Sequence, residues 1–201
     1  MARIAKLQPA EWNEEVRTLL VPTLGPVAGL EGRADGDEQR PLDILLVLAH
    51  DPKVLGPFLA WAAALVFDGA LSRRDHELLA LRTAANCASD FEWAHHAVYA
   101  RAAGLDEDEI ARVAAGPNAV GWDPADAALL RAADELHVSK TIADVTWERL
   151  AEQLTPAALV EVPWVVGQYT MLSMIANATD VGIRPGDDAL PAARVAPSVT
   201  W

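Results

Sequence analysis

The sequence predicts an all-α fold, a helical bundle, on three observations. Alanine and leucine dominate a chain of 201 residues in which 52% are hydrophobic and only 6% aromatic, a composition that favours helices. Capping residues followed by proline or by acidic residues recur along the chain and mark helix starts. No segment carries a convincing β-strand pattern. The length suits one domain.

Four helices are expected in the first half of the chain. The first ends near Pro22, and a segment rich in glycine, proline and charge follows it as a loop. Asp51 and Pro52 form the cap and first turn of the third helix. Ser72 caps the fourth, with Asp75 at its third position in a weak capping box. The expected helices are residues 9–20, 42–49, 52–67 and 73–87, and the expected loop is residues 24–41.

Five more helices are expected in the second half. Gly104 and Gly116 end two of them, because glycine tolerates the backbone conformation that closes a helix. Thr155 and Pro156 begin the last and longest helix. With their capping residues, the expected helices are 90–104 (Ser89 or Asp90), 107–115 (Asp106), 124–137 (Asp123), 145–154 (Asp144) and 156–178 (Thr155).

The helical core is expected to span residues 42–182, after an N-terminal helix and loop (1–41) and before a tail (183–201). Two segments of this core resemble each other, "LSRRDHELLALR" from Leu71 and "LTPAALVEVPWV" from Leu154. Each has a leucine, a capping hydroxyl and then a glutamate, Glu77 or Glu161, on an apolar helix. A two-helix unit used twice is therefore an alternative to one continuous bundle.

Composition excludes several classes of function. A net charge of −13 repels nucleic acid and anionic membranes. A single cysteine, Cys87, allows no intrachain disulfide, and the first residues lack the apolar core of a signal peptide. The longest apolar run, residues 162–178, carries Pro163, Gln168 and Asn177 and is expected to be a buried helix rather than a membrane span. We therefore expect a cytoplasmic protein.

Two consecutive helices bring the candidate site together. Glu92, His96 and Tyr99 share one helical face, beside an apolar stripe that starts at Trp93. Glu77 lies on the apolar stripe of the preceding helix, where burial disfavours a carboxylate unless a cation or donor compensates. A short connection makes the two helices antiparallel, which puts Glu77 within range of Tyr99 and His96.

These residues allow more than one interpretation. A histidine beside a buried carboxylate suits proton transfer, but the same pair can simply join two helices. A third alternative is a di-iron site, because Glu92-x-x-His95 and the near match Asp134-x-x-His137 have its spacing and Glu77 and Glu161 could complete it. The acid of the second motif does not fit that pattern, and we expect no metal.

Three further predictions concern single residues. Cys87 follows an apolar helix and is expected to be a buried, unreactive thiol, since the chain has no second cysteine. His76, early in its helix, is expected to be exposed. The tryptophans are expected to be core or interface anchors; they are Trp12, Trp61, Trp93, Trp122, Trp147, Trp164 and Trp201.

Residues 71–105, "LSRRDHELLALRTAANCASDFEWAHHAVYARAAGL", resemble the carboxymuconolactone decarboxylase family, which includes the alkylhydroperoxidase D type of thiol peroxidase. The match rests on "LSxRxxELxxLRxA", "EWAHH" and "ARxAGL". The resemblance implies an alkylhydroperoxidase D-like all-helical bundle that assembles as trimers or multiples of trimers, with sites near subunit interfaces. In the peroxidase branch, a glutamate, a Cys-x-x-Cys pair and a histidine work together.

The resemblance places the peroxidase glutamate at Glu77 and the histidine at His96, but Ser89 and Glu92 stand where the two cysteines would be. Cys87 lies two residues too early, so disulfide-linked peroxidase chemistry is not expected. The decarboxylase branch implies a cofactor-free lyase that acts on a small carboxylated lactone and protonates a dienolate-like carbon as carbon dioxide leaves.

The leading hypothesis is a homo-oligomeric enzyme that performs acid–base chemistry on a small organic acid or lactone without a cofactor. His96 would be the acid and base, Glu92 and Glu77 would tune and orient it, and His95, Tyr99 and Trp93 would line the substrate pocket. One alternative is a thiol peroxidase that uses Cys87. Another is a non-catalytic ligand-binding or assembly protein.

Overall fold

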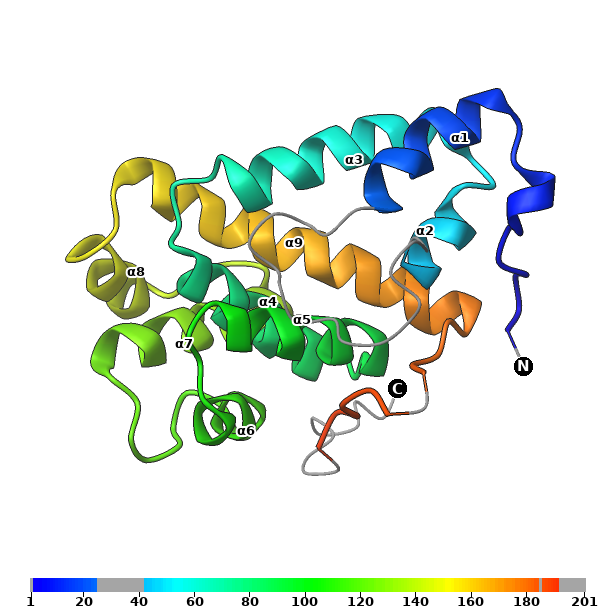
Figure 1. Cartoon of the computed structure of the whole chain (residues 1–201). Coiled ribbons are helices and arrows are strands. Elements are labelled where there is room, and N and C mark those ends of the chain that lie inside the picture. Colours follow the sequence, from blue (N-terminus) through cyan, green and yellow to red (C-terminus); the bar gives the residue numbers. More distant parts are fainter. Residues whose placement is uncertain (1, 25–41, 185, 192–201) are drawn as a thin grey trace.

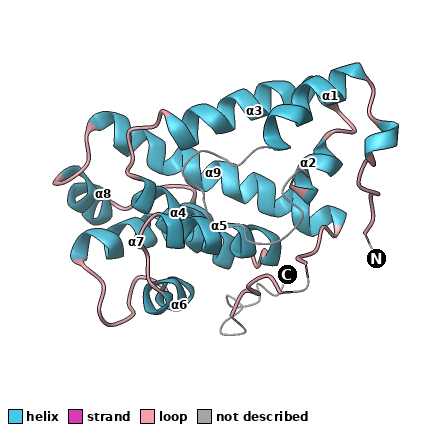
Figure 2. Cartoon of the chain, viewed as in Figure 1, coloured by secondary structure: helices cyan, strands magenta, loops and turns pink. Residues whose placement is uncertain are grey.

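A computed structural model describes residues 2–24, 42–184 and 186–191. The described residues form helices and loops and contain no strand, which confirms the all-α prediction (Figures 1 and 2). The expected loop over 24–41 lies, beyond its first residue, outside the described part, as do residues 192–201 of the tail. In chain order the elements are η1 (Pro9–Glu11), α1 (Glu14–Leu20), η2 (Val21–Leu24), α2 (Asp43–Leu48), α3 (Pro52–Phe67), α4 (Arg73–Asn86), α5 (Asp90–Ala102), α6 (Glu107–Ala115), α7 (Pro124–Ser139), α8 (Asp144–Ala151) and α9 (Pro156–Thr179).

Helix α4 is the centre of the bundle. It packs most extensively against α5, α7 and α9, and all but one of the residues from His76 to Thr83 are buried. The exception, Arg82, points between α6 and α7. Because α4 packs against α5, α6, α7 and α9, side chains on its different faces reach separate parts of the fold.

Most helix starts carry the caps that the sequence predicts. The side chains of Ser72, Ser89 and Thr155 each accept a hydrogen bond from a backbone N–H in the first turn of α4, α5 and α9. Asp106 forms a full capping box with Glu109 at the start of α6. Since a capping residue fixes where the helix begins, it also fixes which side chains point inward.

The prediction of one continuous helix over residues 9–20 is wrong, because the structure has two separate elements there. A short 3₁₀ turn, η1, ends at Glu11, and α1 begins only at Glu14. The Asn13 side chain accepts a hydrogen bond from the Val16 N–H and so caps a new helix. Asparagine is among the best capping residues, which explains the interruption.

The connection between α4 and α5 contains only Cys87, Ala88 and Ser89. Ala88 has a φ of 48°, in the left-handed region that residues other than glycine rarely adopt. The Ser89 N–H donates to the Ala84 carbonyl and closes the end of α4. This tight turn brings α5 back along α4 and places their side chains in contact.

Helix α9 crosses the molecule beneath α3 (Figure 1). Within the described residues it is the helix long and apolar enough to cross a membrane, but half of its most apolar window is buried by the other helices. Its inward side carries Glu161, Gln168 and Tyr169, which are buried polar residues. We therefore describe α9 as the core helix of a soluble helical domain.

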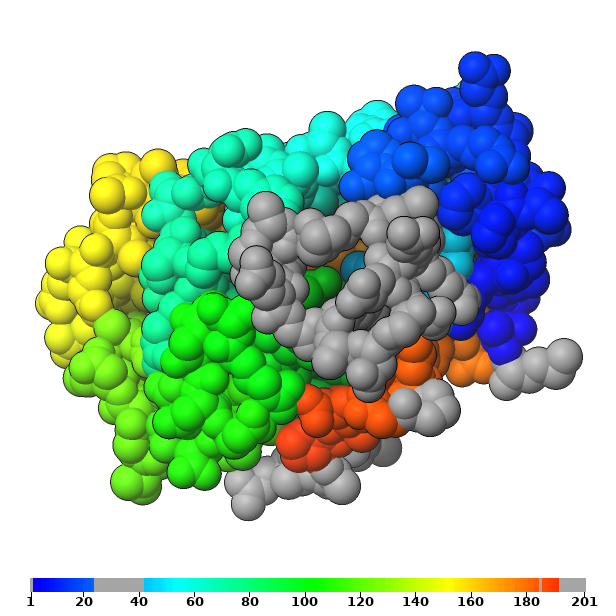
Figure 3. Space-filling view, in the orientation of Figure 1, coloured from blue at the N-terminus to red at the C-terminus, as the bar shows by residue number. Residues whose placement is uncertain are grey.

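The described part of the tail lies against the helices rather than apart from them. Figure 3 shows its residues, in red, against the surface of α5 and α6. Asp188 pairs with Arg101 of α5 at 2.7 Å, and the Leu190 N–H donates to Asp90 at 3.3 Å. Arg184 also reaches Asp43 of α2. The described part of the tail is thus held against α2 and α5.

Arg82 is expected to be a major contributor to stability. Its guanidinium binds Asp134 of α7 at 2.5 Å and donates to the carbonyls of Val113 and Ala114 at the end of α6. Arg82→Ala would leave these acceptors unpaired and lower the free energy of unfolding by about 2–3 kcal/mol, measured by urea titration.

Arg149→Ala is the matched control for this change. Arg149 pairs with Glu152 at 2.9 Å, but both side chains are more than half exposed, so its loss should cost less than about 1 kcal/mol. Equal losses for the two arginines would contradict the assignment of a structural role to Arg82.

Candidate functional site

A buried contact between α4 and α5 is the centre of the candidate site. Nδ1 of His96 lies 2.6 Å from Oε2 of Glu77, and both side chains are buried. A carboxylate can only accept a hydrogen bond, so His96 donates through Nδ1. This contact fixes the orientation of the imidazole ring and leaves its other nitrogen, Nε2, free for a second partner.

That second partner is Glu92, one helical turn before His96 on α5. Oε2 of Glu92 lies 3.8 Å from Nε2 of His96, within the range of an ion pair but too long for a hydrogen bond. The other oxygen of Glu92, Oε1, is buried and has no hydrogen-bond partner. A buried polar atom without a partner is rare and costly, which marks Oε1 as an atom available to a ligand.

The environment raises the pKa values of both Glu92 and His96. Burial raises the pKa of Glu92 to about 7, although the charge of His96 opposes this. Burial alone would lower the pKa of His96, but the charge and hydrogen bond of Glu77 and the charge of Glu92 raise it overall. A carboxyl that titrates near pH 7, as Glu92 does, can both give and take a proton under ordinary conditions.

Tyr169 of α9 packs over the His96 ring of this cluster. The sequence analysis did not select this residue. Its ring packs against that of His96, with centroids 4.3 Å apart, and its hydroxyl lies 2.8 Å from Nε2 of His76. Burial raises the pKa of Tyr169 well above its ordinary value, so the hydroxyl keeps its proton. The sequence signal that could have identified Tyr169 is that its phenol places a polar hydroxyl within the longest apolar run, residues 162–178.

The prediction that His76 is exposed is wrong. The side chain is buried against Tyr169, and burial lowers its pKa to about 4. A neutral imidazole that meets a tyrosine hydroxyl is a satisfied polar pair. The error arose because a position early in a helix usually faces solvent, whereas here α9 packs over the start of α4.

The residues expected to line the substrate pocket lie in different places. The Tyr99 ring packs against His96, with centroids 5.4 Å apart. The His95 ring packs on that of Phe91, and its Nδ1 lies within hydrogen-bond distance, 2.7 Å, of the Phe91 carbonyl. Trp93 is 2% exposed and belongs to the hydrophobic core. The roles of all three in binding stay predictions.

The di-iron alternative is not supported by the described residues, among which no group of three or more histidine, cysteine or acidic side chains could hold a metal. The proposed ligands have other partners. Asp134 binds Arg82, and Glu161 accepts hydrogen bonds from the N–H groups of Ala70 and Leu71. Glu161 therefore fixes the segment before α4 rather than joining Glu77.

Cys87 lies at the end of α4, away from the Glu77 contact. The prediction of a buried thiol is only partly met, since the side chain is of intermediate exposure. Its sulfur lies 3.8 Å from Nδ1 of His137. Burial raises the pKa of the Cys87 thiol and lowers that of the His137 imidazole, so the pair is neutral rather than a thiolate–imidazolium.

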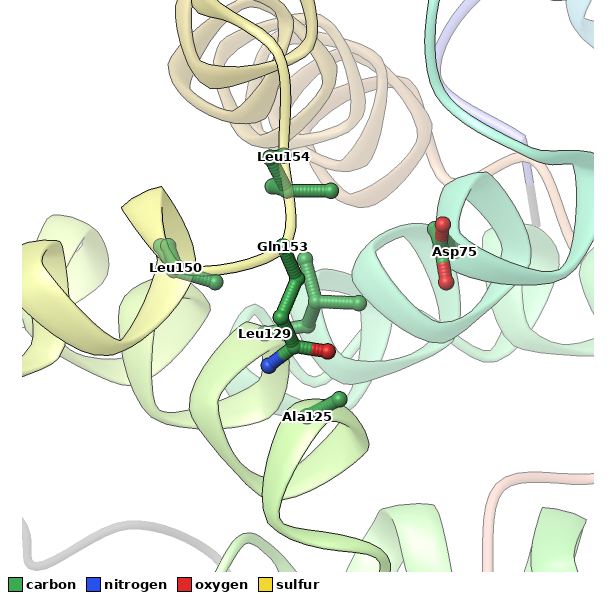
Figure 4. A pocket seen from close by; sticks show the side chains of 6 residues that line it. All are labelled: Asp75, Ala125, Leu129, Leu150, Gln153 and Leu154. Atoms are coloured by element: carbon green, nitrogen blue, oxygen red, sulfur yellow. The ribbon is translucent and has the colours of Figure 1, made fainter.

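A small cavity of about 150 Å³ lies elsewhere in the bundle, beside the first turn of α4. Figure 4 shows Asp75 on one side of it and Gln153 and Leu129 on the other. None of the candidate residues Glu77, Glu92 or His96 lines it. This cavity is therefore separate from the acid–base cluster.

Comparison with known proteins gives a family and a fold. Residues 52–135 match the model of the Carboxymuconolactone decarboxylase family. These residues run from the start of α3 into α7 and include the whole Glu77, Glu92 and His96 cluster. Among curated protein sequences the chain has no match.

Solved structures share the fold. A peroxidase-related protein from Ralstonia eutropha with an alkylhydroperoxidase AhpD core superposes with a TM-score of 0.76, at 17% identity, over 91% of this chain and 92% of that one. The debrominase Bmp8, in complex with 2,3,4-tribromopyrrole, superposes with a TM-score of 0.71, at 14% identity, over 90% of this chain and 91% of that one. At such identities the likeness concerns the fold alone.

Glu92→Gln is expected to remove part of the pH dependence of stability. The raised pKa of Glu92 means that the folded state favours the protonated carboxyl, so this contribution is present below about pH 4.5 and is lost as the pH rises through about 7. The variant cannot ionise. It should gain on the order of 3 kcal/mol relative to the wild type at pH 8, and under about 1 kcal/mol at pH 5.

The measurement is urea unfolding of both proteins at the two pH values. Any fixed cost of the amide cancels when the two differences are compared. A gain that is equal at pH 5 and pH 8 would show that Glu92 ionises in the folded protein as it does in the unfolded chain.

Proposed function

We propose that this chain, whose residues 52–135 match the Carboxymuconolactone decarboxylase family model and whose fold is alkylhydroperoxidase D-like, is an acid–base enzyme of that superfamily. It uses the cluster of Glu77, His96 and Glu92 and needs no cofactor. The observation that carries the proposal is the imidazole of His96, bound through Nδ1 to one buried carboxylate and facing another whose Oε1 has no partner.

Glu77 is the positioning residue of this site. Its hydrogen bond keeps the proton of His96 on Nδ1, so Nε2 is the nitrogen that exchanges protons. Its charge also stabilises the imidazolium that forms when Nε2 takes a proton. A buried carboxylate behind a histidine performs both tasks in many acid–base enzymes.

Glu92 and His96 handle the proton in the proposed reaction. With its pKa near 7, the Glu92 carboxyl can donate to a substrate oxygen or carbon through Oε1. In a decarboxylation, the bond to the carboxylate carbon breaks, carbon dioxide leaves, and the electron pair stays on the substrate as a dienolate. A proton from Glu92 or from Nε2 of His96 then forms the new C–H bond, and water restores the proton.

The proposed substrate is a small carboxylated lactone or a related organic acid. The substrate class comes from the family, and the charge of the site is compatible with it. A protonated Glu92 and a protonated His96 beside Glu77 leave the cluster without net negative charge, so an anionic substrate is not repelled. A related lyase or isomerase step would use the same proton transfer.

A thiol peroxidase remains the alternative, favoured by the contact between Cys87 and His137. Two features weigh against it. Burial raises rather than lowers the pKa of the thiol, and the chain contains no second cysteine to resolve an oxidised one. A non-catalytic binding protein would keep the Glu77–His96 contact but would have no use for the unpartnered oxygen of Glu92.

As part of the same proposal, the enzyme acts in the cytoplasm as a homo-oligomer. The single cysteine suits a reducing compartment, and the acidic surface offers no site for nucleic acid. The family resemblance suggests trimers or multiples of trimers.

The test is the release of carbon dioxide from carboxymuconolactone and related carboxylated lactones. His96→Ala and Glu92→Gln should each lower kcat/KM by about 10²- to 10⁴-fold, the usual contribution of one general acid or base. Glu77→Gln should lower kcat and shift the pH profile, since the tautomer and charge of His96 change.

Cys87→Ser is the control that separates the two chemistries. It should leave lactone turnover unchanged. Loss of peroxide consumption in Cys87→Ser, together with an unaffected His96→Ala variant, would overturn the acid–base proposal in favour of the thiol alternative.

A further inference from the structure

Gln168 of α9 is a buried polar residue that the acid–base chemistry above does not use. Among the described residues, three buried side-chain atoms have no hydrogen-bond partner, and Oε1 of Gln168 is one of them. The other two are Oε1 of Glu92 and the hydroxyl of Ser173. Gln168 is only 6% exposed, so bulk solvent does not supply the missing donor. Folded proteins keep few such atoms, and each one calls for an explanation.

The Gln168 amide lies beside the hydroxyl of Tyr169, at the edge of the candidate site. That hydroxyl is 2.8 Å from Nε2 of His76. Burial is the main cause that raises the pKa of Tyr169, and the charges of Glu77 and Glu92 add to it, because both carboxyls are close to the hydroxyl. The Gln168 amide acts in the opposite direction and lowers this pKa by offering an N–H to the same oxygen. Gln168 therefore borders the acid–base cluster.

The contacts of Tyr169 also orient the amide. Burial lowers the pKa of His76 to about 4, so its imidazole is neutral and its Nε2 can accept the one proton of the Tyr169 hydroxyl. The tyrosine oxygen then has only lone pairs left for Gln168, which turns an N–H toward it. Oε1 of Gln168 consequently points away from Tyr169, where it has no partner in the protein.

An amide oxygen selects the groups that it can bind. It accepts hydrogen bonds at every pH, whereas Glu92 accepts when ionised and can donate when protonated. Carboxylates and lactone carbonyls offer only acceptors, so they cannot satisfy Oε1 of Gln168. A hydroxyl can, because it carries a proton to donate. The unpartnered amide oxygen thus requires a ligand with a donor in addition to its acid or lactone group.

We propose that Gln168 binds a hydroxyl group of the substrate through Oε1. This inference rests on the acid–base function proposed above and narrows its substrate class to carboxylated lactones or organic acids that also carry a hydroxyl. Gln168 is then a specificity-determining residue. A molecule without the hydroxyl leaves the buried amide oxygen unpaired, and a site built to bind a hydroxyl rejects such analogues strongly.

The experiment compares two small lactones that differ by one hydroxyl, α-hydroxy-γ-butyrolactone and γ-butyrolactone. Neither has a carboxylate to lose, so binding to the full chain is measured without turnover, by nuclear magnetic resonance titration. The wild type should bind the hydroxylated lactone at least about 10-fold more tightly, because the other lactone leaves a buried acceptor unpaired. Equal dissociation constants in the wild type would overturn the proposal without recourse to any variant.

Gln168→Met removes the acceptor at nearly unchanged side-chain length and should abolish the preference for the hydroxylated lactone. Gln168→Leu makes the same test if the methionine variant does not fold, as judged by circular dichroism. Gln153→Met is the matched control, since Gln153 is exposed and lines the separate small cavity of Figure 4. A preference that survives the loss of Gln168, or that disappears in Gln153→Met, would overturn the proposal, the second result by placing the lactone in that cavity.

These binding measurements separate the role of Gln168 from the proposed reaction. Release of carbon dioxide from carboxymuconolactone by a protein that shows no hydroxyl preference would contradict the role of Gln168 and leave the acid–base function standing. A hydroxyl preference that depends on Gln168, in a protein that releases no carbon dioxide, would support the binding role and contradict the decarboxylation.

Discussion

The hydrogen bond between His96 and Glu77 is the interaction on which the site depends. It joins α4 to α5 in the buried centre of the bundle at 2.6 Å. Removing one partner of such a buried pair leaves an uncompensated polar group, which typically costs about 3–5 kcal/mol. The same contact fixes which nitrogen of His96 faces Glu92. The Glu77–His96 pair therefore contributes both to the stability of the fold and to the proposed proton transfer.

Helix α9 supports the candidate site from its inner side. Its inner side supplies Tyr169 to the His96 ring and Glu161 to the backbone before α4. Its outer side carries exposed apolar residues, among them Trp164, Met171 and Met174. By length and composition alone, α9 would be predicted to span a membrane. In the fold, however, its inner side makes buried polar contacts with the rest of the bundle.

Much of the fold and part of the site could be predicted from the sequence. Local rules sufficed for the helix starts, because Ser72, Ser89 and Thr155 each act within their own first turn. Spacing also put Glu92 and His96 on one face, and the short turn brought Glu77 opposite them. Tyr169 and the burial of His76 depend on a helix about ninety residues later in the chain, and no local pattern reports such a contact.

The most direct test of the central claim is a nitrogen NMR titration of the His96 imidazole. Our account predicts a proton held on Nδ1 throughout, a titrating Nε2, and a midpoint above 6.5 that falls in Glu77→Gln. A midpoint near 6.5 that does not respond to Glu77→Gln, or a proton on Nε2 in the neutral ring, would contradict it.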